Sequence, residues 1–384
     1  MGQSVILRAW NGPSRLALLA VLGLGCGGSG GSAGGSASAA AGGDAEQISA
    51  AGYGSCVLES GGVVCWGNAS AGPAAVAGLA SGVASVAVGY EQTCALASGA
   101  VVCWGWDGYG QLGNGSTGEG YSSTPVAVSG LSSGGTAIAS GGDHSCALVG
   151  GAASCWGWNA YGQLGNGSTA DSSVPVPVSG LASGATAIGA GIEHTCAVVR
   201  GAAWCWGWNA YGQLGNPSSG YSAVPSPVTG LSAGVTAIAA GGLHTCVLAG
   251  GGVQCFGDNA YGQLGNGFTT NSFFPVQVSG LTEGVTAVAA GGYHSCALVN
   301  GGVKCWGRND YGELGDGTTV DSAVPVGVSG LSAGVTAIAA GDFHTCAVAT
   351  GRVVCWGDNG EGEVGAESGA TSSVPVEVSG VPPQ

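Results

Sequence analysis

The sequence predicts an all-β protein with the architecture of a seven-bladed β-propeller. Three observations lead there: a cysteine-containing phrase that recurs seven times, four short strand patterns within each recurrence, and a glycine content of 81 in 384 residues. So much glycine disfavours long helices, because each interior glycine costs about 1 kcal/mol relative to alanine. Repetition at a fixed period of this length is typical of propellers and solenoids.

The repeat is defined by its first cysteine. From Cys146 onward successive copies are 50 residues apart, whereas the first two steps are 38 and 52 residues. The seven copies are centred on Cys56, Cys94, Cys146, Cys196, Cys246, Cys296 and Cys346.

Each copy contains four runs with the composition of strands. In one unit these are residues 275–279, 286–290, 294–299 and 302–306, and the stretch around 257–267 is too rich in Gly and Asn for regular structure. Four strands repeated seven times match a propeller of four-stranded antiparallel blades.

The chain ends suggest how the ring closes. Residues 47–51 match the second strand of a unit, so the first unit lacks a first strand, and residues 374–379 match a first strand with no unit after it. We therefore expect the C-terminal strand to complete the first blade, which removes the open edges of a linear stack.

Cysteines carry the strongest chemical signal, because two in each unit are separated by eight residues with a turn dipeptide such as Asn300-Gly301 at the midpoint. Counting outward from that turn places Cys296 opposite Cys305 in a non-hydrogen-bonded pair, near enough for a disulfide. The predicted disulfides are Cys56–Cys65, Cys94–Cys103, Cys146–Cys155, Cys196–Cys205, Cys246–Cys255, Cys296–Cys305 and Cys346–Cys355. Zinc is the rival interpretation, but this spacing is not a usual zinc spacing, so we expect no metal.

The N-terminus has the pattern of an export signal. Arg8 and Arg15 precede an apolar run that is too short to span a membrane, and Cys26 follows it directly. This pattern resembles a bacterial lipoprotein signal, which predicts a signal peptide with a lipobox over residues 1–26, lipidation of Cys26, and a Gly/Ser-rich tether over 27–44. Residues 45–384 then form the propeller. The expected location is the cell envelope, as an outer-membrane or surface lipoprotein. Secretion with later cleavage is the alternative, because Gly23 stands where that signal usually has Leu.

Net charge excludes one class of partner. The chain carries 21 acidic and 6 basic residues, a formal charge of −15. A surface this acidic repels phosphate backbones, so we expect no nucleic-acid binding.

The recurring string from His294 through Trp306 to Gly315 resembles the repeat of the regulator of chromosome condensation family. The resemblance implies a seven-bladed propeller that presents loops to a protein partner. It does not imply guanine-nucleotide exchange activity, because the chain is expected to be exported. Unit one departs most, with Gly54 in place of His and no Tyr-Gly-Gln-Leu-Gly loop, and unit two has Gln92 in place of His.

Two sets of residues are candidate partner contacts. The residue before each histidine varies within an otherwise uniform repeat, and rotation of the blades would set these positions in a ring that is half acidic and half apolar, suited to a basic, partly apolar partner. They are Glu91, Asp143, Glu193, Leu243, Tyr293 and Phe343. Large aromatics in the loops before the Pro-Val strands are the second set, since exposed aromatics often anchor contacts. They are Tyr121, Tyr221, Phe268, Phe273 and Phe274.

No enzyme site emerges, because every reactive residue type follows the repeat instead of gathering at one place. The expected function is a monomeric, non-enzymatic scaffold that binds a protein at the cell envelope, with no cofactor and with the membrane reached only through the N-terminal lipid. Envelope glycan binding is the alternative, with Trp158 and Trp208 stacking on sugars. The five histidines, one in each of units three to seven, are expected to make a repeated structural hydrogen bond.

Overall fold

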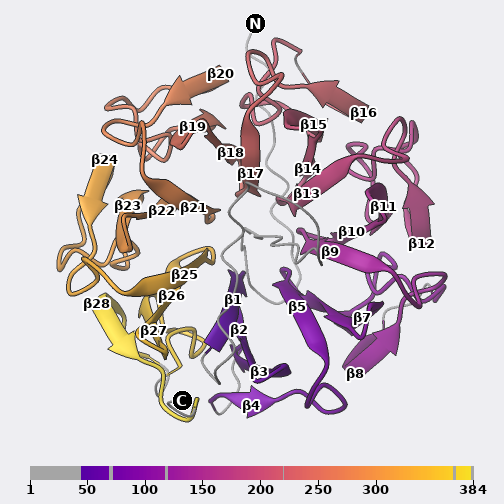
Figure 1. Cartoon of the computed structure of the whole chain (residues 1–384), viewed down its shortest axis with the longest axis horizontal. Helices are drawn as coiled ribbons and strands as arrows, with labels where there is room; N and C mark the ends of the chain where they lie inside the picture. The colour runs from indigo at the N-terminus through magenta and orange to yellow at the C-terminus, as the bar shows by residue number, and fades with distance from the viewer. Residues whose placement is uncertain (1–44, 69–71, 117–119, 219, 366–368, 382–384) are drawn as a thin grey trace, which may run out of the picture.

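The computed structural model describes residues 45–68, 72–116, 120–218, 220–365 and 369–381. In these ranges the strands form seven four-stranded sheets, arranged as blades around a central axis (Figure 1). Each blade is an antiparallel meander in chain order, with its first strand nearest the axis and its fourth at the rim. The prediction of a seven-bladed propeller with four-stranded blades is confirmed.

The strands of the first three blades are as follows. Blade 1 comprises β1 (Ala45–Ala51), β2 (Gly54–Glu59), β3 (Gly62–Gly67) and β4 (Ala74–Ala75). Blade 2 comprises β5 (Val83–Val88), β6 (Gln92–Ala97), β7 (Ala100–Trp106) and β8 (Tyr121–Ala127). Blade 3 comprises β9 (Gly135–Ser140), β10 (His144–Val149), β11 (Ala152–Gly157) and β12 (Ser172–Pro177).

The remaining four blades repeat this layout. Blade 4 comprises β13 (Ala185–Ala190), β14 (His194–Val199), β15 (Ala202–Trp208) and β16 (Tyr221–Pro227). Blade 5 comprises β17 (Val235–Ala240), β18 (His244–Ala249), β19 (Gly252–Gly257) and β20 (Ser272–Gln277). Blade 6 comprises β21 (Val285–Ala290), β22 (His294–Val299), β23 (Gly302–Gly307) and β24 (Ser322–Gly327). Blade 7 comprises β25 (Val335–Ala340), β26 (His344–Ala349), β27 (Arg352–Gly357) and β28 (Ser372–Glu377).

The expected closure of the ring by the C-terminal strand is wrong. β28 pairs with β27 in blade 7, and blade 1 is completed by its own two-residue strand β4, which pairs with β3. The Pro-Val strand is therefore the last strand of each blade and not the first. The long loop after the third strand returns the chain to the same blade, as the pairing of Cys255 with Val276 shows.

The ring is closed by packing between complete blades. β1 packs against β25 and β26, as other first strands pack against their neighbours. Several hydrogen bonds between described residues cross this boundary between blades 7 and 1. Ser55 Oγ lies 2.8 Å from His344 Nε2, Trp66 Nε1 donates to the carbonyl of Glu363, and the Asp342 amide donates to the carbonyl of Gly52.

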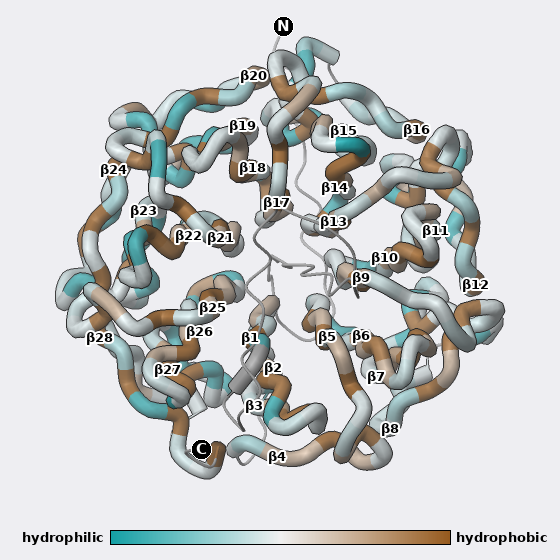
Figure 2. The backbone as a smooth tube through the Cα atoms, viewed as in Figure 1, coloured by the Kyte–Doolittle hydropathy of each residue, from teal (hydrophilic) through white to brown (hydrophobic). Residues whose placement is uncertain are grey.

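The hydrophobic core lies between the blades. Second strands are buried almost throughout, whereas fourth strands alternate between half-buried and exposed residues. Figure 2 shows hydrophobic segments along the inner strands accordingly. In blades 3, 4, 6 and 7 the indole that follows the second cysteine, for example Trp156 or Trp206, is fully buried between blades.

The predicted hairpins and disulfides are confirmed. Cys296 pairs with Cys305 in the β22–β23 ladder, and in the turn between them Asn300 and Gly301 have φ of 51° and 79°, the left-handed conformation that a two-residue hairpin turn requires. All seven disulfides are present, with Cα atoms 4.0–4.1 Å apart. Seven such bonds indicate an oxidising, extracytoplasmic environment.

The predicted signal peptide, Cys26 and the tether lie outside the described residues. Within the described ranges, no helix has the length and apolar character needed to cross a membrane.

Candidate functional site

In blades 2 to 7, two segments of each blade reach the same face of the ring. In blade 3 these are the turn 141–143 and the long loop 158–171. They meet because His144 pairs with Gly157 and the amide of Trp158 donates to the carbonyl of Asp143 at 2.8 Å. The two-residue hairpin turns lie at the other end of the same strands. We call the surface made by the turns and long loops the loop face.

The residues before the histidines occupy equivalent turns around the loop face. On blades 2, 3 and 4 they are Glu91, Asp143 and Glu193, which we call the acidic arc. Leu243, Tyr293 and Phe343 follow on blades 5, 6 and 7. The equivalent position of blade 1 is Tyr53, which sequence reasoning missed because the histidine after it is replaced by Gly54.

The carboxyl groups of the acidic arc lie in an environment that disfavours their charged form. Burial, reinforced by the charge of Glu91, raises the pKa of Asp143 to about 7. Burial, with Asp143 as the second cause, raises the pKa of Glu193 to about 7. Burial also raises the pKa of Glu91. A cation bound beside these carboxylates would relieve the cost of ionising them.

A continuous row of aromatic rings runs alongside the acidic arc. Neighbouring ring centres in this row are 5.3 to 6.1 Å apart, and three of the five contacts are edge-to-face. Its members, which we call the Trp–Tyr row, are Trp106, Tyr109, Trp158, Tyr161, Trp208 and Tyr211. The acidic arc lies close to the Trp–Tyr row. Burial is the main cause that raises the pKa of Tyr109 and of Tyr161, and the charge of Asp143 raises the first further, as the charge of Glu193 does the second.

The other side of the loop face carries its own cation. The guanidinium carbon of Arg308 lies 5.1 to 5.7 Å from the ring centres of four aromatic residues. They are Tyr261, Tyr293, Tyr311 and Phe343, and with Arg308 we call them the Arg308 cluster. Tyr293 and Phe343 also stack on each other, with ring centres 6.2 Å apart.

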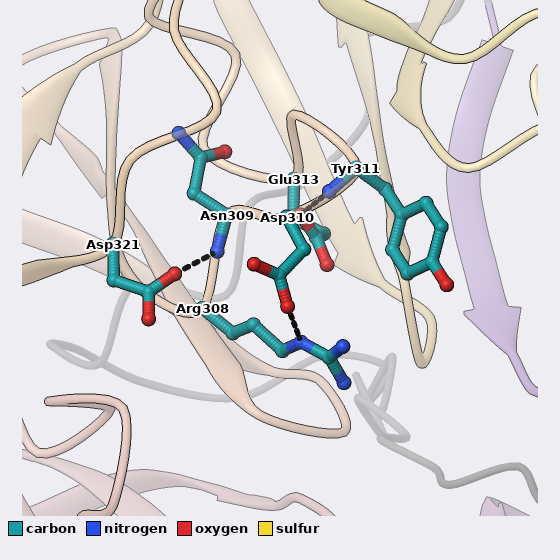
Figure 3. A network of polar contacts seen from close by, with 6 residues as sticks. All are labelled: Arg308, Asn309, Asp310, Tyr311, Glu313 and Asp321. Atoms are coloured by element: carbon teal, nitrogen blue, oxygen red, sulfur yellow. Dashed lines mark hydrogen bonds and ion pairs between the residues drawn. The ribbon is translucent and has the colours of Figure 1, made fainter.

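Hydrogen bonds within the long loop of blade 6 position Arg308 and its neighbours. In Figure 3, Arg308 Nε donates to the carboxylate of Asp310 at 2.7 Å, the Asn309 amide donates to Asp321, and the Tyr311 amide donates to Glu313. The buried Asn309 side chain also accepts from the Leu314 amide at 2.9 Å. The long loop of blade 6 is therefore positioned by hydrogen bonds within itself.

The second predicted set lies around the outer rim. Tyr121, Tyr221, Phe268 and Phe274 are exposed, whereas Phe273 is half-buried. Four of the five stand in outer strands and not in loops, because those strands begin earlier than the sequence suggested. Tyr121 lies opposite Trp106 in the β7–β8 ladder and Tyr221 lies opposite Trp208 in the β15–β16 ladder, so both tyrosines are backbone neighbours of the Trp–Tyr row.

The histidines are buried hydrogen-bonding residues. Nε2 of His144 lies 2.8 Å from the hydroxyl of Thr195 on the next blade, and His194 meets Thr245 in the same way. Burial lowers the pKa of each of the five to about 3, so they are neutral at pH 7. Among the described residues no group of His, Cys, Asp and Glu could hold a metal ion.

Comparison with known proteins decides the family. Five successive segments match the family model described as the regulator of chromosome condensation (RCC1) repeat: residues 98–148, 151–198, 200–248, 250–298 and 300–348. The chain belongs to the RCC1 repeat family. A second model of the same repeat matches residues 235–263, 285–313 and 335–363 of this RCC1-repeat protein. Among curated proteins, none matches the sequence.

Solved structures share the RCC1 fold. Human WBSCR16 is 26% identical, with a TM-score of 0.71 over 80% of this chain and 84% of that one. Prp20p from Saccharomyces cerevisiae, whose structure was described with its binding properties to Gsp1p and histones, is 23% identical. It has a TM-score of 0.71 over 83% of this chain and 86% of that one.

Proposed function

We propose that this RCC1-repeat protein is a non-enzymatic binding scaffold whose loop face takes a basic, partly apolar segment of a protein partner. One observation carries the proposal: the acidic arc lies directly beside the Trp–Tyr row on blades 2 to 4. Carboxylates attract a Lys or Arg side chain, and Trp faces hold it by cation–π contact.

The Arg308 cluster supports this assignment from within the molecule. On blades 5 to 7 the aromatic side chains of the loop face surround a guanidinium supplied by the chain itself. Among the described basic residues, Arg200 and Arg352 stand at or next to hairpin turns on the opposite face, and Lys304 lies within strand β23. The loop face of blades 2 to 4 therefore offers aromatic rings and carboxylates with no described cation on that face, because Arg200 lies at the opposite end of blade 4. Tyr293 and Phe343 already contact Arg308, so the proposed contact is centred on the acidic arc.

The expected place of action is the cell envelope, with the N-terminal segment as an export signal and Cys26 as the lipid attachment point. The disulfides support an extracytoplasmic location, and the −15 charge disfavours nucleic acid as the partner. Mass spectrometry of the protein purified from its native membrane tests the anchor. A diacylglycerol-sized addition on Cys26 is expected, and an unmodified N-terminus after cleavage elsewhere would contradict it.

The binding proposal is tested with an Arg-rich peptide that also contains Leu, titrated calorimetrically into the propeller. Glu91→Gln, Asp143→Asn and Glu193→Gln together should weaken binding at least tenfold, with a reduced salt dependence. The matched control removes three carboxylates away from the loop face, Glu59→Gln, Glu283→Gln and Glu377→Gln. Equal losses in both triple variants would mean that only overall charge matters, and would contradict a site on the loop face.

Envelope glycan binding is the second candidate, and the Trp–Tyr row favours it because indole and phenol faces stack on sugars. Replacing Trp158 and Trp208 with Leu should then abolish binding of a cell-wall oligosaccharide, while neutralising the acidic arc should leave it unchanged. If instead the protein binds the basic peptide, and neutralising the acidic arc weakens that binding, the partner is a protein.

A further inference from the structure

The seam between blades 1 and 2 differs from the other six. At those six seams, the long loop of one blade extends over the next and its backbone carbonyl accepts hydrogen bonds from that blade. For example, the carbonyl of Gln163 accepts from both Thr195 Oγ1 and Trp206 Nε1, each at 2.8 Å. Leu164, the next residue, is fully buried. Each such loop thus supplies a carbonyl oxygen and, in most copies, a leucine to its neighbour.

Blade 1 lacks this loop. Residues 68–73 connect β3 to β4, where blade 3 has residues 158–171 between β11 and β12. Blade 1 also has Gly54 where blades 3 to 7 place the histidine that reaches the next blade's Ser or Thr. Both partners that blade 2 would receive from its neighbour are therefore missing from the sequence of blade 1.

The consequence appears on blade 2. Neither the hydroxyl of Thr93 nor the indole N–H of Trp104 has a hydrogen bond to any described residue, although their counterparts Thr195 and Trp206 both do. Trp104 is 9% exposed, whereas Trp206 is 0% exposed. Gln92 Nε2 donates to two carbonyls of blade 3, and its buried Oε1 has no partner among the described residues.

These groups line one cleft of about 220 Å³ between the two blades. Trp66, Val88 and Trp104 form its apolar walls, Thr93 and Gln92 its polar groups, and Glu91 lies beside them. The volume is below the roughly 300–1,000 Å³ of ordinary small-molecule pockets, so it suits the tip of a peptide loop more than a larger ligand.

We propose that this cleft is a docking site for a peptide loop of a partner protein, bound as the chain's own long loops bind at the other seams. The partner supplies a backbone carbonyl to Trp104 Nε1 and Thr93 Oγ1, an N–H to Gln92 Oε1, and an aliphatic side chain to the apolar walls. The internal copies show that this chemistry fits, because a Gln carbonyl followed by a buried Leu satisfies the same positions at neighbouring seams. Glu91 favours a neutral or basic peptide. This site is distinct from the Trp–Tyr row and does not require it.

The probe for the test is the capped peptide of residues 159–166, Asn-Ala-Tyr-Gly-Gln-Leu-Gly-Asn, titrated into the whole folded protein. Trp104→Phe and Thr93→Val should each weaken binding about three- to tenfold, the effect of one lost hydrogen bond. Phe is compatible with the fold here, because Phe256 occupies the equivalent place in blade 5. Trp206→Phe and Thr195→Val, at a seam filled by the chain itself, are the matched controls and should leave peptide binding unchanged.

A second variant fills the cleft with a long loop of the chain itself. Replacing residues 68–73 with residues 158–171 should abolish peptide binding and raise the melting temperature. Absence of binding to the unmodified protein, or binding that Trp104→Phe does not weaken, would overturn the proposal. Binding of chitotriose that depends on Trp104, with none of the peptide, would overturn it in favour of a glycan. Asp143→Asn and Glu193→Gln lie outside the cleft and should not change peptide binding, which separates this result from the test of the acidic arc.

Discussion

His344 Nε2 in the last blade lies 2.8 Å from the hydroxyl of Ser55 in the first blade. The same contact joins blade 3 to blade 4 through His144 and Thr195. The seam that closes the ring thus uses the same hydrogen bond as a seam between consecutive blades, and no described strand crosses it.

The closing seam should be as important for stability as an internal one. His344→Ala and His194→Ala should each lower the free energy of unfolding by about 1–3 kcal/mol, because a buried hydroxyl loses its partner. Urea denaturation measures both. Restoration by His344→Gln, whose counterpart Gln92 donates to two backbone carbonyls of the next blade, would show that a hydrogen bond across the boundary matters and not the ring shape. No loss from His344→Ala beside a clear loss from His194→Ala would contradict closure through this contact.

The buried histidines should make the protein sensitive to acid. Their folded pKa of about 3 lies below the unfolded value of 6.5, so the unfolded state binds the extra protons and stability from these groups is lost as pH falls from about 6.5 to 3. Asp143, Glu193 and Glu313, whose pKa values burial raises to about 7, oppose this down to about pH 4. Net destabilisation should therefore be steepest below pH 4.

His194→Gln isolates the effect of one histidine. On acidification from pH 6.5 to 3 this variant should lose less stability than the parent, by about 1.4 kcal/mol per pH unit at most. Thermal melts of both proteins across this range give the difference. Parallel curves would mean that His194 is not buried as a neutral group.

Binding of a basic peptide to the acidic arc should strengthen with rising pH. Asp143 and Glu193 ionise near pH 7, and only their charged forms attract a cation. The affinity of the Arg-rich peptide should rise between pH 6 and 8, and Asp143→Asn with Glu193→Gln should flatten that rise. A pH profile that is unchanged in the double variant would assign the dependence to other groups.

Each disulfide should contribute modestly and independently. Closing a loop of about ten residues is worth about 2–3 kcal/mol in the chain-entropy model. Replacing Cys246 and Cys255 with Val should cost about that amount and leave the other blades oxidised, as counted by the mass after alkylation without reduction. A loss of the whole fold from this single pair would show cooperativity between blades beyond what a local cross-link supplies.

The Arg308 cluster should stabilise blades 5 to 7. Arg308→Ala removes a cation from four aromatic rings and should lower the free energy of unfolding by about 1–2 kcal/mol, with a change in the near-ultraviolet circular dichroism. Arg352→Ala, which breaks an exposed ion pair with Glu377, is the control and should have a much smaller effect.

Sequence alone predicted the features that depend on short separations along the chain. The pairing of Cys296 with Cys305 follows from a two-residue turn between them, because strand register is set by the turn within ten residues. The number of blades follows from counting copies. The positions before the histidines could be named for the same reason, except Tyr53, whose copy of the motif is incomplete.

Only the tertiary structure decided where one blade ends and the next begins. A periodic pattern has no beginning, so the Pro-Val strand fits equally well before or after the other three, and the pairing of β28 with β27 depends on how a long loop returns. Contacts between blades could not be predicted from the sequence either. Arg308 meets Phe343, and Trp104 has no hydrogen-bond partner among the described residues. Rotation about the ring brings together segments from different repeats, and which side chains then meet depends on three-dimensional packing.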